Sequence, residues 1–310
     1  MTTLAPPTPA QPTPGRPAPA PPESATGQAP TPGLRTARRR PVAGTVGLVA
    51  AGAVVGTVLL SALVPGLLAP QDPLEISLSE SFAPPSAEHL FGTDQSGRDV
   101  FSRVIHGARQ SLVIGIGATA IGLAGALVLG MLGGLGGRIA DGAVTRVIEV
   151  LYAFPGILLA LILIAVYGNS ALTQMVAVGL ATMPGYARMV RGQLLVVRAS
   201  AYVEAARALG HPPVRILLRT LLPNAFRPLT VLITLGIGQA IVWAAALRFL
   251  GMGVQPPTAE WGAMLNAGRN YIQQAWWMDF FPGITIVLFT LSLTVLGRHL
   301  QRATDAGAQR

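Results

Sequence analysis

The sequence predicts an all-α integral membrane protein with six transmembrane helices, and three observations lead to this fold class. Hydrophobic residues make up 51% of the 310 residues, and charged residues make up only 11%. The mean hydropathy of +0.53 is far above that of a soluble domain of this length. The apolar residues gather in six stretches separated by arginine-containing segments, which is the pattern of a chain that crosses a membrane repeatedly.

The first segment is predicted to be disordered. Residues 1 to about 34 are dominated by Pro, Ala and Thr, a composition that cannot bury enough apolar surface to order a chain. The basic cluster "RTARRR" (Arg35–Arg40) completes a predicted cytoplasmic tail, residues 1–40. The uncharged run 41–71 is the first predicted membrane helix. It is longer than the apolar region of a secretory signal, so we expect a retained anchor, with cleavage near "ALVPGLLA" as the alternative.

Five further apolar spans follow a predicted extracytoplasmic segment at 72–109. They lie at about 110–137, 147–168, 170–187, 228–247 and 280–297, within a five-helix core at 110–300 that precedes a cytoplasmic tail at 301–310. A cytoplasmic start for the first helix places the loops 138–146 and 188–227 on the inner side. Arginines dominate these inner loops, whereas the first outer segment holds six acids against three arginines. The positive-inside rule therefore supports this orientation.

Glycines and prolines within the spans indicate local structure. Gly130 and Gly134 are four residues apart, hence on one helical face, and predict close packing of another helix there. Pro155, Pro184 and Pro282 lie in spans or at their ends, where each removes a backbone donor. We expect structural kinks at these prolines rather than gating hinges.

Several classes of chemistry are excluded by composition. The chain has no cysteine, and all 22 of its basic residues are arginine, so thiolate and lysine chemistry are absent. The stretch "FGTDQSGRDVFSR" (Phe91–Arg103) has glycines spaced as in a phosphate-binding loop but lacks the lysine that such a loop requires. The net charge of +9 comes from arginines spread between apolar spans, so no nucleic-acid partner is expected. The four histidines lie far apart and indicate no metal site.

The longest inner loop, 188–227, is the least membrane-like part of the core. Good helix formers run from Ala201 to Leu209, and Gly210 followed by two prolines ends that helix. A second amphipathic turn is predicted to run to Leu222 and to stop at Pro223. The helix predicted from Ala201 to Leu209 has a face of small alanine side chains, which suits docking into a groove of another protein. The alternative is an amphipathic helix on the lipid surface.

This loop resembles the cytoplasmic EAA loop of binding-protein-dependent ABC importer permeases. The likeness is in "EAARALG" (Glu204–Gly210) and, after a spacer, in "LLPN" (Leu221–Asn224). Other stretches are similar to the C-type, or second, permease subunit of the dipeptide/oligopeptide/nickel branch; they are "FGTDQSGRDVFSRVIHGARQSL", "YAFPGILLALIL", "PGYARMVRGQ", "FLGMGVQPPTAEWGAMLNAGRNYI" and "FFPGITIVL". The resemblance extends from about His89 to Asp305 and places the "FGTDQSGRD" segment on the outer side.

The resemblance implies a type I ABC importer permease fold and a transport subunit that is not an enzyme. It implies no cofactor in this chain, because a partner ATPase binds ATP and magnesium. The implied partners are a B-type permease subunit, two ATPase subunits, an extracytoplasmic solute-binding protein and the lipid bilayer of a bacterial cell membrane. The implied ATPase-coupling residues are Glu204, Ala205, Ala206, Arg207, Leu209, Gly210, Leu222, Pro223 and Asn224.

The substrate class follows from the same resemblance. Short peptides are the expected substrates, with nickel or another small solute as the alternative. An ATP-independent secondary transporter is a further alternative. Such carriers often show repeat halves and buried ionisable groups, and the six spans of this sequence offer little of either. Gln174 and Gln239 are polar groups inside spans and are candidate pathway residues. The alternative for each is an interhelical hydrogen bond.

Two positions depart from the family pattern. Arg248 stands where a small polar residue is usual, and Arg298 stands where an acid is usual. Neither belongs to the EAA loop. Arg248 lies near the outer end of the fifth span, where it is expected to influence what enters the pathway.

Overall fold

The computed structural model describes residues 42–69, 71–226, 229–253 and 257–308, and the predicted tail 1–40 lies outside these ranges. Apart from one isolated bridge between Thr93 and Asp99, the regular secondary structure in the described residues is helical. The helices are α1 (Val42–Leu63), α2 (Pro65–Leu68), η1 (Leu78–Glu80), α3 (Val100–Leu135), α4 (Gly137–Ala153), α5 (Gly156–Tyr167), α6 (Ala171–Arg198), α7 (Ala201–Ala208), α8 (Pro213–Ile216), η2 (Leu217–Leu221), α9 (Leu222–Phe226), α10 (Leu229–Phe249), α11 (Trp261–Gly268) and α12 (Trp277–Ala308).

Six membrane spans were predicted, and the described residues hold four or five candidates by length and composition. Four helices in the described residues, α1, α3, α10 and α12, are long and apolar enough to cross a membrane. The pair α4 and α5 adds a fifth span if it is counted as one, although its two halves meet at an angle of 83°. The predicted span 170–187 lies in α6, whose composition does not reach the same hydropathy because it includes Thr, Gln and Arg.

A bend divides the span predicted at 147–168 between two helices, α4 and α5. Phe154 has extended backbone angles, and Pro155 precedes the first residue of α5. A residue before proline is driven away from helical geometry, and the proline itself has no N–H to donate. The helix therefore ends at Ala153 and restarts at Gly156 in a new direction.

Helix α3 begins at Val100, earlier than the predicted start at 110, because its N-terminus is capped. The Asp99 side chain accepts a hydrogen bond of 2.7 Å from the Ser102 N–H. The predicted outer segment 72–109 therefore shares its last part with this helix. Buried ion pairs hold the segment in place, since the Asp94 carboxylate lies 2.7 Å from Arg98 and 3.6 Å from Arg103.

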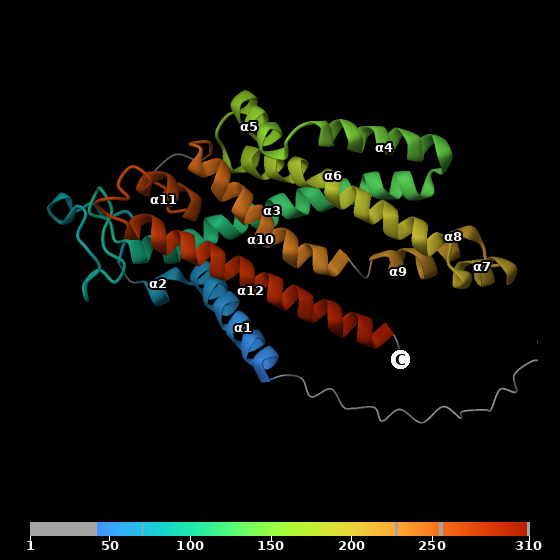
Figure 1. The fold of residues 1–310 in the computed structure, drawn as a ribbon, viewed down its shortest axis with the longest axis horizontal. Coiled ribbons are helices and arrows are strands. Elements are labelled where there is room, and N and C mark those ends of the chain that lie inside the picture. The colour runs from blue at the N-terminus through green and yellow to red at the C-terminus, as the bar shows by residue number, and fades with distance from the viewer. Residues whose placement is uncertain (1–41, 70, 227–228, 254–256, 309–310) are drawn as a thin grey trace, which may run out of the picture. The chain divides into compact units, whose positions relative to one another are not determined.

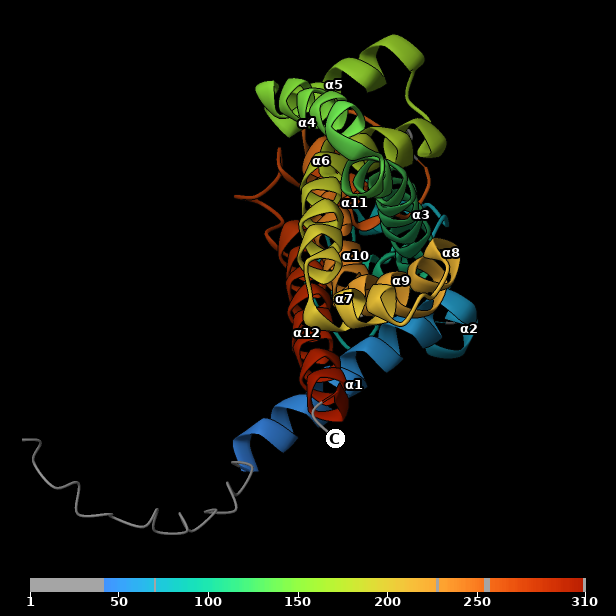
Figure 2. The ribbon, with the colours of Figure 1, turned by 90° about the vertical axis from the view of Figure 1, so that its right-hand side faces the viewer.

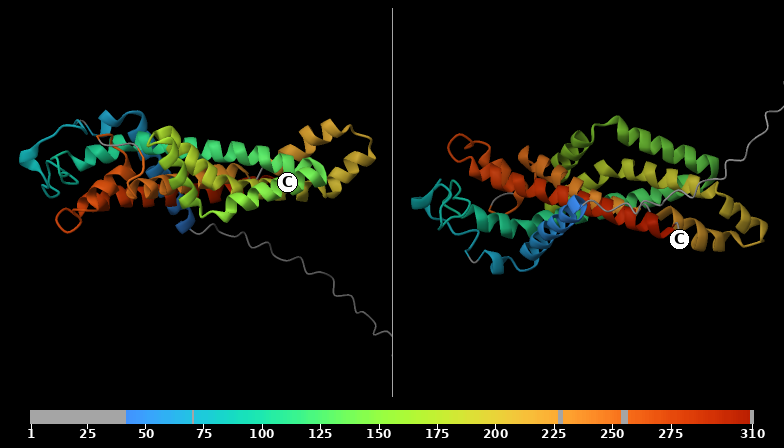
Figure 3. Two further views of the ribbon diagram at one scale, coloured as in Figure 1. Left: turned by 90° about the horizontal axis from the view of Figure 1, so that it is seen from above. Right: turned by 60° about the horizontal axis from the view of Figure 1, so that its bottom comes forward.

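The centre of the bundle is a close contact between α3 and α6. A Cβ on Gly130 would lie 2.5 Å from Val190, and one on Gly134 would lie 2.8 Å from the Leu194 Cβ. Backbones approach this closely only where side chains are absent, so the close packing predicted for these glycines is confirmed. Helices α10 and α12 run beside this pair (Figures 1 and 3).

The remaining short elements gather at opposite ends of the bundle. Figure 1 shows α7, α8 and α9 at one end, and α11 with the segment 71–99 at the other. Figure 2, seen from the first end, shows α7 to α9 grouped in front of the long helices. Pro184 and Pro282 both lie inside helices, α6 and α12.

Candidate coupling loop and pathway residues

The candidate coupling loop begins where α6 ends. Helix α7 occupies Ala201–Ala208, and Leu209 is its C-cap, which confirms the helix predicted there. Val203 is fully buried, whereas Glu204 and Ala205 are exposed and Ala206 is half-buried. The helix is therefore anchored by one apolar side chain and presents a polar, small-residue face outward.

Gly210 ends α7 in a left-handed conformation. Its φ is +74°, its N–H donates to the Arg207 carbonyl at 2.9 Å, and the His211 N–H donates to the Ala206 carbonyl at 3.2 Å. These two bonds form a Schellman motif, which satisfies carbonyls at the end of a helix and reverses the chain. The turn predicted at this glycine is present, and its direction is fixed by two backbone hydrogen bonds.

The chain then returns through a second arm, formed by α8, η2 and α9. Leu221 and Ala225 of this arm are buried against Val190, Leu194 and Val197 of α6. The buried positions on α6 are spaced by three and four residues and so form one helical face. Helix α6 therefore continues to Arg198, and the loop predicted to start at 188 is in fact an ordered helical extension followed by a short hairpin.

Pro223 does not stop the second arm, which corrects the prediction. The arm continues to Phe226, and the turn before Pro223 is π-helical, with the Leu222 N–H donating to the Leu217 carbonyl. A widened turn leaves room for the proline ring, which clashes with the preceding turn of an ordinary α-helix. The Asn224 side chain donates to the Thr220 carbonyl at 2.7 Å, so a carbonyl in the turn before Pro223 has a hydrogen-bond partner.

Two arginines predicted to lie on the inner side fix this end of the bundle. Arg191 forms a two-pronged ion pair with Asp141 of α4, in which the Nη2–Oδ2 distance is 2.8 Å. Arg198 donates to the Gly134 carbonyl at 3.2 Å, near the end of α3. These two arginines therefore connect α3, α4 and α6 at the end of α6 that leads into α7.

Comparison with known proteins identifies the class of this arrangement. The family model described as "Binding-protein-dependent transport system inner membrane component" matches residues 126–306, which include the coupling loop and the helices on both sides of it. The chain belongs to this family. It is a permease subunit of an ABC transporter complex and a multi-pass inner-membrane protein, and the partner ATPase, not the permease, binds ATP.

Relatives extend the match across most of the chain. The permease is 39% identical over 254 residues to the di/tripeptide transport system permease protein of Pseudomonas aeruginosa, covering 80% of this chain and 84% of that protein. It is 40% identical over 261 residues to a probable D,D-dipeptide transport system permease protein of Escherichia coli, covering 84% and 87%. It is 41% identical over 221 residues to the glutathione transport system permease protein of Pectobacterium atrosepticum, covering 71% and 73%.

Solved structures show the same fold at lower identity. The inward-facing methionine ABC transporter MetNI superimposes with a TM-score of 0.55 at 21% identity, covering 66% of this chain and 97% of that chain. An amino acid ABC transporter with histidines gives a TM-score of 0.54 at 15% identity, covering 66% and 94%. The permease therefore has the fold of an ABC importer permease.

The two candidate pathway glutamines have different surroundings. Gln174 is fully buried, and its amide donates to the Ala244 carbonyl of α10 at 3.0 Å, which is an interhelical hydrogen bond. Gln239 is exposed on α10, and the exposed Val242 and Phe249 follow it at helical spacing on the same face. The described chain leaves this face of α10 uncovered, so Gln239 is the better placed of the two to meet a pathway or a partner.

Glu260 is a residue that the sequence reasoning missed. The Arg248 guanidinium, in the last turn of α10, lies 3.2 Å from the Glu260 carboxylate, and both residues are buried. A lone arginine near the end of an apolar span signals such a partner, because a buried charge needs a counter-ion. Glu260 also caps α11, which explains how the acid is held. In the described residues no group of three or more His, Cys, Asp or Glu side chains is arranged to hold a metal ion.

Proposed function

We propose that this permease is the C-type subunit of an importer of short peptides of the di- and tripeptide class, which includes glutathione. The observation that supports this substrate class is the identity of about 40% to permeases named for di/tripeptides, D,D-dipeptides and glutathione. The partners are a B-type permease subunit, two ATPase subunits and an extracytoplasmic solute-binding protein. Nickel import by the same architecture is the alternative.

The coupling mechanism rests on α7. Glu204 makes polar or charged contacts with the ATPase, and Ala205 and Ala206 permit close approach of the two backbones. Arg207 and Leu209, both exposed, flank this contact. Gly210 sets the turn that brings the chain back, so α7 projects as a short rigid helix. Closure of the ATPases on ATP then displaces α7 and the helices packed against it as a body.

The second arm transmits that displacement. Leu222, Pro223 and Asn224 lie in α9, next to residues that are buried against α6. Because interfaces packed this tightly are not continuously deformable, a shift of α7 moves α6 and α3 with it.

We assign six spans, counting α4 and α5 together as one bent span, and an inner position for α7 to α9. Helix α6 has 28 residues and is therefore roughly 42 Å long at 1.5 Å per residue, enough to cross the bilayer. It packs against α3, α5 and α10, which explains why it is less apolar than a lipid-facing helix. With α6 as a span, both termini lie in the cytoplasm of a bacterial cell, in agreement with the arginine distribution.

The pathway passes the exposed face of α10. An uncovered amide in the middle of an apolar helix is costly in lipid, because its hydrogen bonds are unmet there. Gln239 therefore faces the B-type subunit or the water-filled path between the two permeases. Gln174 contributes through its hydrogen bond to α10.

The experiment that tests this function is reconstitution of the transporter purified from its native membrane. Proteoliposomes are loaded with ATP on the ATPase side, and uptake of a labelled dipeptide is measured with the solute-binding protein present. We expect uptake only with hydrolysable ATP. Dipeptide uptake without ATP would support a secondary transporter, and uptake of Ni²⁺ alone, without dipeptide uptake, would support the nickel alternative.

A further inference from the structure

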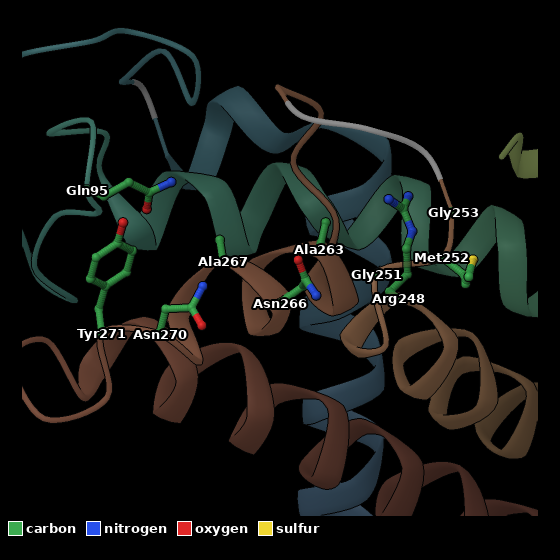
Figure 4. A pocket seen from close by; sticks show the side chains of 10 residues that line it. All are labelled: Gln95, Arg248, Gly251, Met252, Gly253, Ala263, Asn266, Ala267, Asn270 and Tyr271. Carbon is green, nitrogen blue, oxygen red and sulfur yellow. The ribbon is translucent and has the colours of Figure 1, made fainter.

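A second site lies at the outer end of the bundle. A cavity of about 270 Å³ opens between the end of α10, α11, the connection from α11 to α12 and the outer segment. Figure 4 shows Arg248, Gln95, Asn266, Asn270 and Tyr271 around it. This volume is close to the lower end of the range for small-molecule sites, roughly 300–1,000 Å³, which is room for one end of a short peptide.

One member of a buried ion pair lines the cavity. Arg248 is the only charged residue among the described residues that line it. The carboxylate of its counter-ion, Glu260, lies 3.2 Å from the Arg248 guanidinium and is also held by α11, where its Oε1 accepts from the Gly262 N–H at 2.9 Å and its Oε2 accepts from the Ala263 N–H at 2.9 Å. The Ser111 hydroxyl is a further donor to Glu260 at 3.2 Å. The Glu260 carboxylate is therefore shared among several donors, and Arg248, one of its partners, also lines the cavity.

The other polar groups of the cavity are suited to a peptide backbone. The Gln95 Oε1 is buried and has no hydrogen-bond partner among the described residues. The Asn266 amide nitrogen donates to the Phe249 carbonyl at 2.8 Å, so its nitrogen is engaged and its oxygen is turned toward the cavity (Figure 4). Oxygens of this kind accept hydrogen bonds from N–H groups, and a buried acceptor without a partner is costly.

We propose that this outer pocket binds the carboxylate end of a short peptide as it enters the permease. The guanidinium of Arg248 attracts the carboxylate, which is the anion whose geometry an arginine fork matches. Gln95 and Asn266 accept hydrogen bonds from the peptide N–H groups. This inference rests on the proposed function, because it names how that substrate is recognised on the outer side.

The test uses the absence of cysteine in this chain. Asn270→Cys places a thiol at the exposed rim of the cavity, and Gln273→Cys places one on the same connection outside the lining, as a matched control. The reconstituted transporter is labelled from outside with a membrane-impermeant thiol reagent, and labelling of this chain is measured. The probes are L-alanyl-L-alanine, its C-terminal amide and inorganic phosphate.

We expect the dipeptide acid to slow labelling of Asn270→Cys at a concentration about tenfold or more below that needed for the amide. Labelling of Gln273→Cys should be unchanged by any probe. Equal protection by acid and amide would contradict recognition of a carboxylate, and protection by phosphate as strong as that by the dipeptide would indicate a general anion site instead.

The role of Arg248 is isolated by changing its counter-ion as well. Arg248→Gln alone leaves a buried acid without its cation, whereas the double variant Arg248→Gln/Glu260→Gln removes both charges with side chains of similar shape. We expect Glu260→Gln to retain the preference for the acid and the double variant to lose it. If the double variant does not assemble, Arg248→Lys, which keeps the charge without the fork, should reduce the preference; an unchanged preference in either variant refutes the inference.

The labelling test of the outer pocket can fail while the proposed transport function holds, and the two failures can be told apart. ATP-dependent dipeptide uptake by the wild-type transporter, measured in the same vesicles, tests the function without reference to the cavity. Uptake with no acid-specific protection of Asn270→Cys means that peptides are transported but not bound at this pocket. Absence of uptake and of protection together means that the peptide assignment itself is wrong.

Discussion

Replacing Gly210 should weaken the coupling loop in a graded order. The left-handed conformation at φ +74° costs a residue with a Cβ about 1–2 kcal/mol. No atom lies within 4 Å of an added Cβ, so Gly210→Ala introduces this backbone strain without a clash. Asparagine tolerates the conformation better, and Gly210→Asn should be close to the wild type.

Gly210→Pro should be the most damaging replacement. Proline fixes φ near −65°, far from the observed angle, and it removes the N–H that donates to the Arg207 carbonyl. The Schellman motif is then lost, so the cost exceeds that of Gly210→Ala. The variant should insert normally yet hydrolyse ATP without importing peptide.

Two measurements give the magnitude and the functional effect. Hydrogen exchange at the His211 amide, which is protected by the motif, should be roughly 5–30-fold faster in Gly210→Ala, as expected for 1–2 kcal/mol. Peptide imported per ATP hydrolysed should fall in the order Gly, Asn, Ala, Pro. Gly192→Ala is the matched control, because this glycine on α6 also has no atom within 4 Å of an added Cβ and has no positive φ. Equal effects of alanine at both positions would refute the argument.

Further predictions concern contact, packing and the pathway. Glu204→Ala should lower coupled uptake several-fold. Glu149→Ala, which removes another exposed acid, is the control and should leave uptake unchanged; peptide imported per ATP hydrolysed is measured for both variants. Gly134→Val should destabilise the transporter by about 1–3 kcal/mol through overpacking against α6, seen as a lower midpoint of thermal unfolding. Gln239→Leu should reduce uptake without lowering that midpoint, whereas Gln174→Leu should lower the midpoint because it breaks a buried hydrogen bond worth about 1 kcal/mol.

Local sequence signals predicted the parts of the fold that depend on short stretches of chain. The helix over Ala201 to Leu209 and its end at Gly210 follow from propensity, a glycine and two prolines, and all lie within a few residues. The close contact at Gly130 and Gly134 follows from their spacing. Each of these signals acts over one or two helical turns, so it is readable without the tertiary structure.

Features set by packing were not predictable in the same way. Kinks were predicted at all three prolines, but the sequence does not show that the chain bends by 83° at Pro155 while α6 and α12 stay helical through Pro184 and Pro282. Pro223 was read as a stop because the π-helical turn before it is not visible in the sequence. The pairing of Arg248 with Glu260 joins two elements, and hydropathy shows only that Arg248 needs a counter-ion, without naming it.

The continuity of α6 has a mechanical consequence. One helix is packed against the returning arm of the coupling loop through Leu194 at its inner part, and it is hydrogen-bonded to α10 through Gln174 near its outer end. In the coupling mechanism proposed above, a displacement of the returning arm reaches the end of α10 near Gln174 as the tilt of one continuous helix. The two ends of α6 can move separately only if the helix bends. Pro184 lies between Gln174 and Leu194, and at this position the helix lacks one of its internal backbone hydrogen bonds.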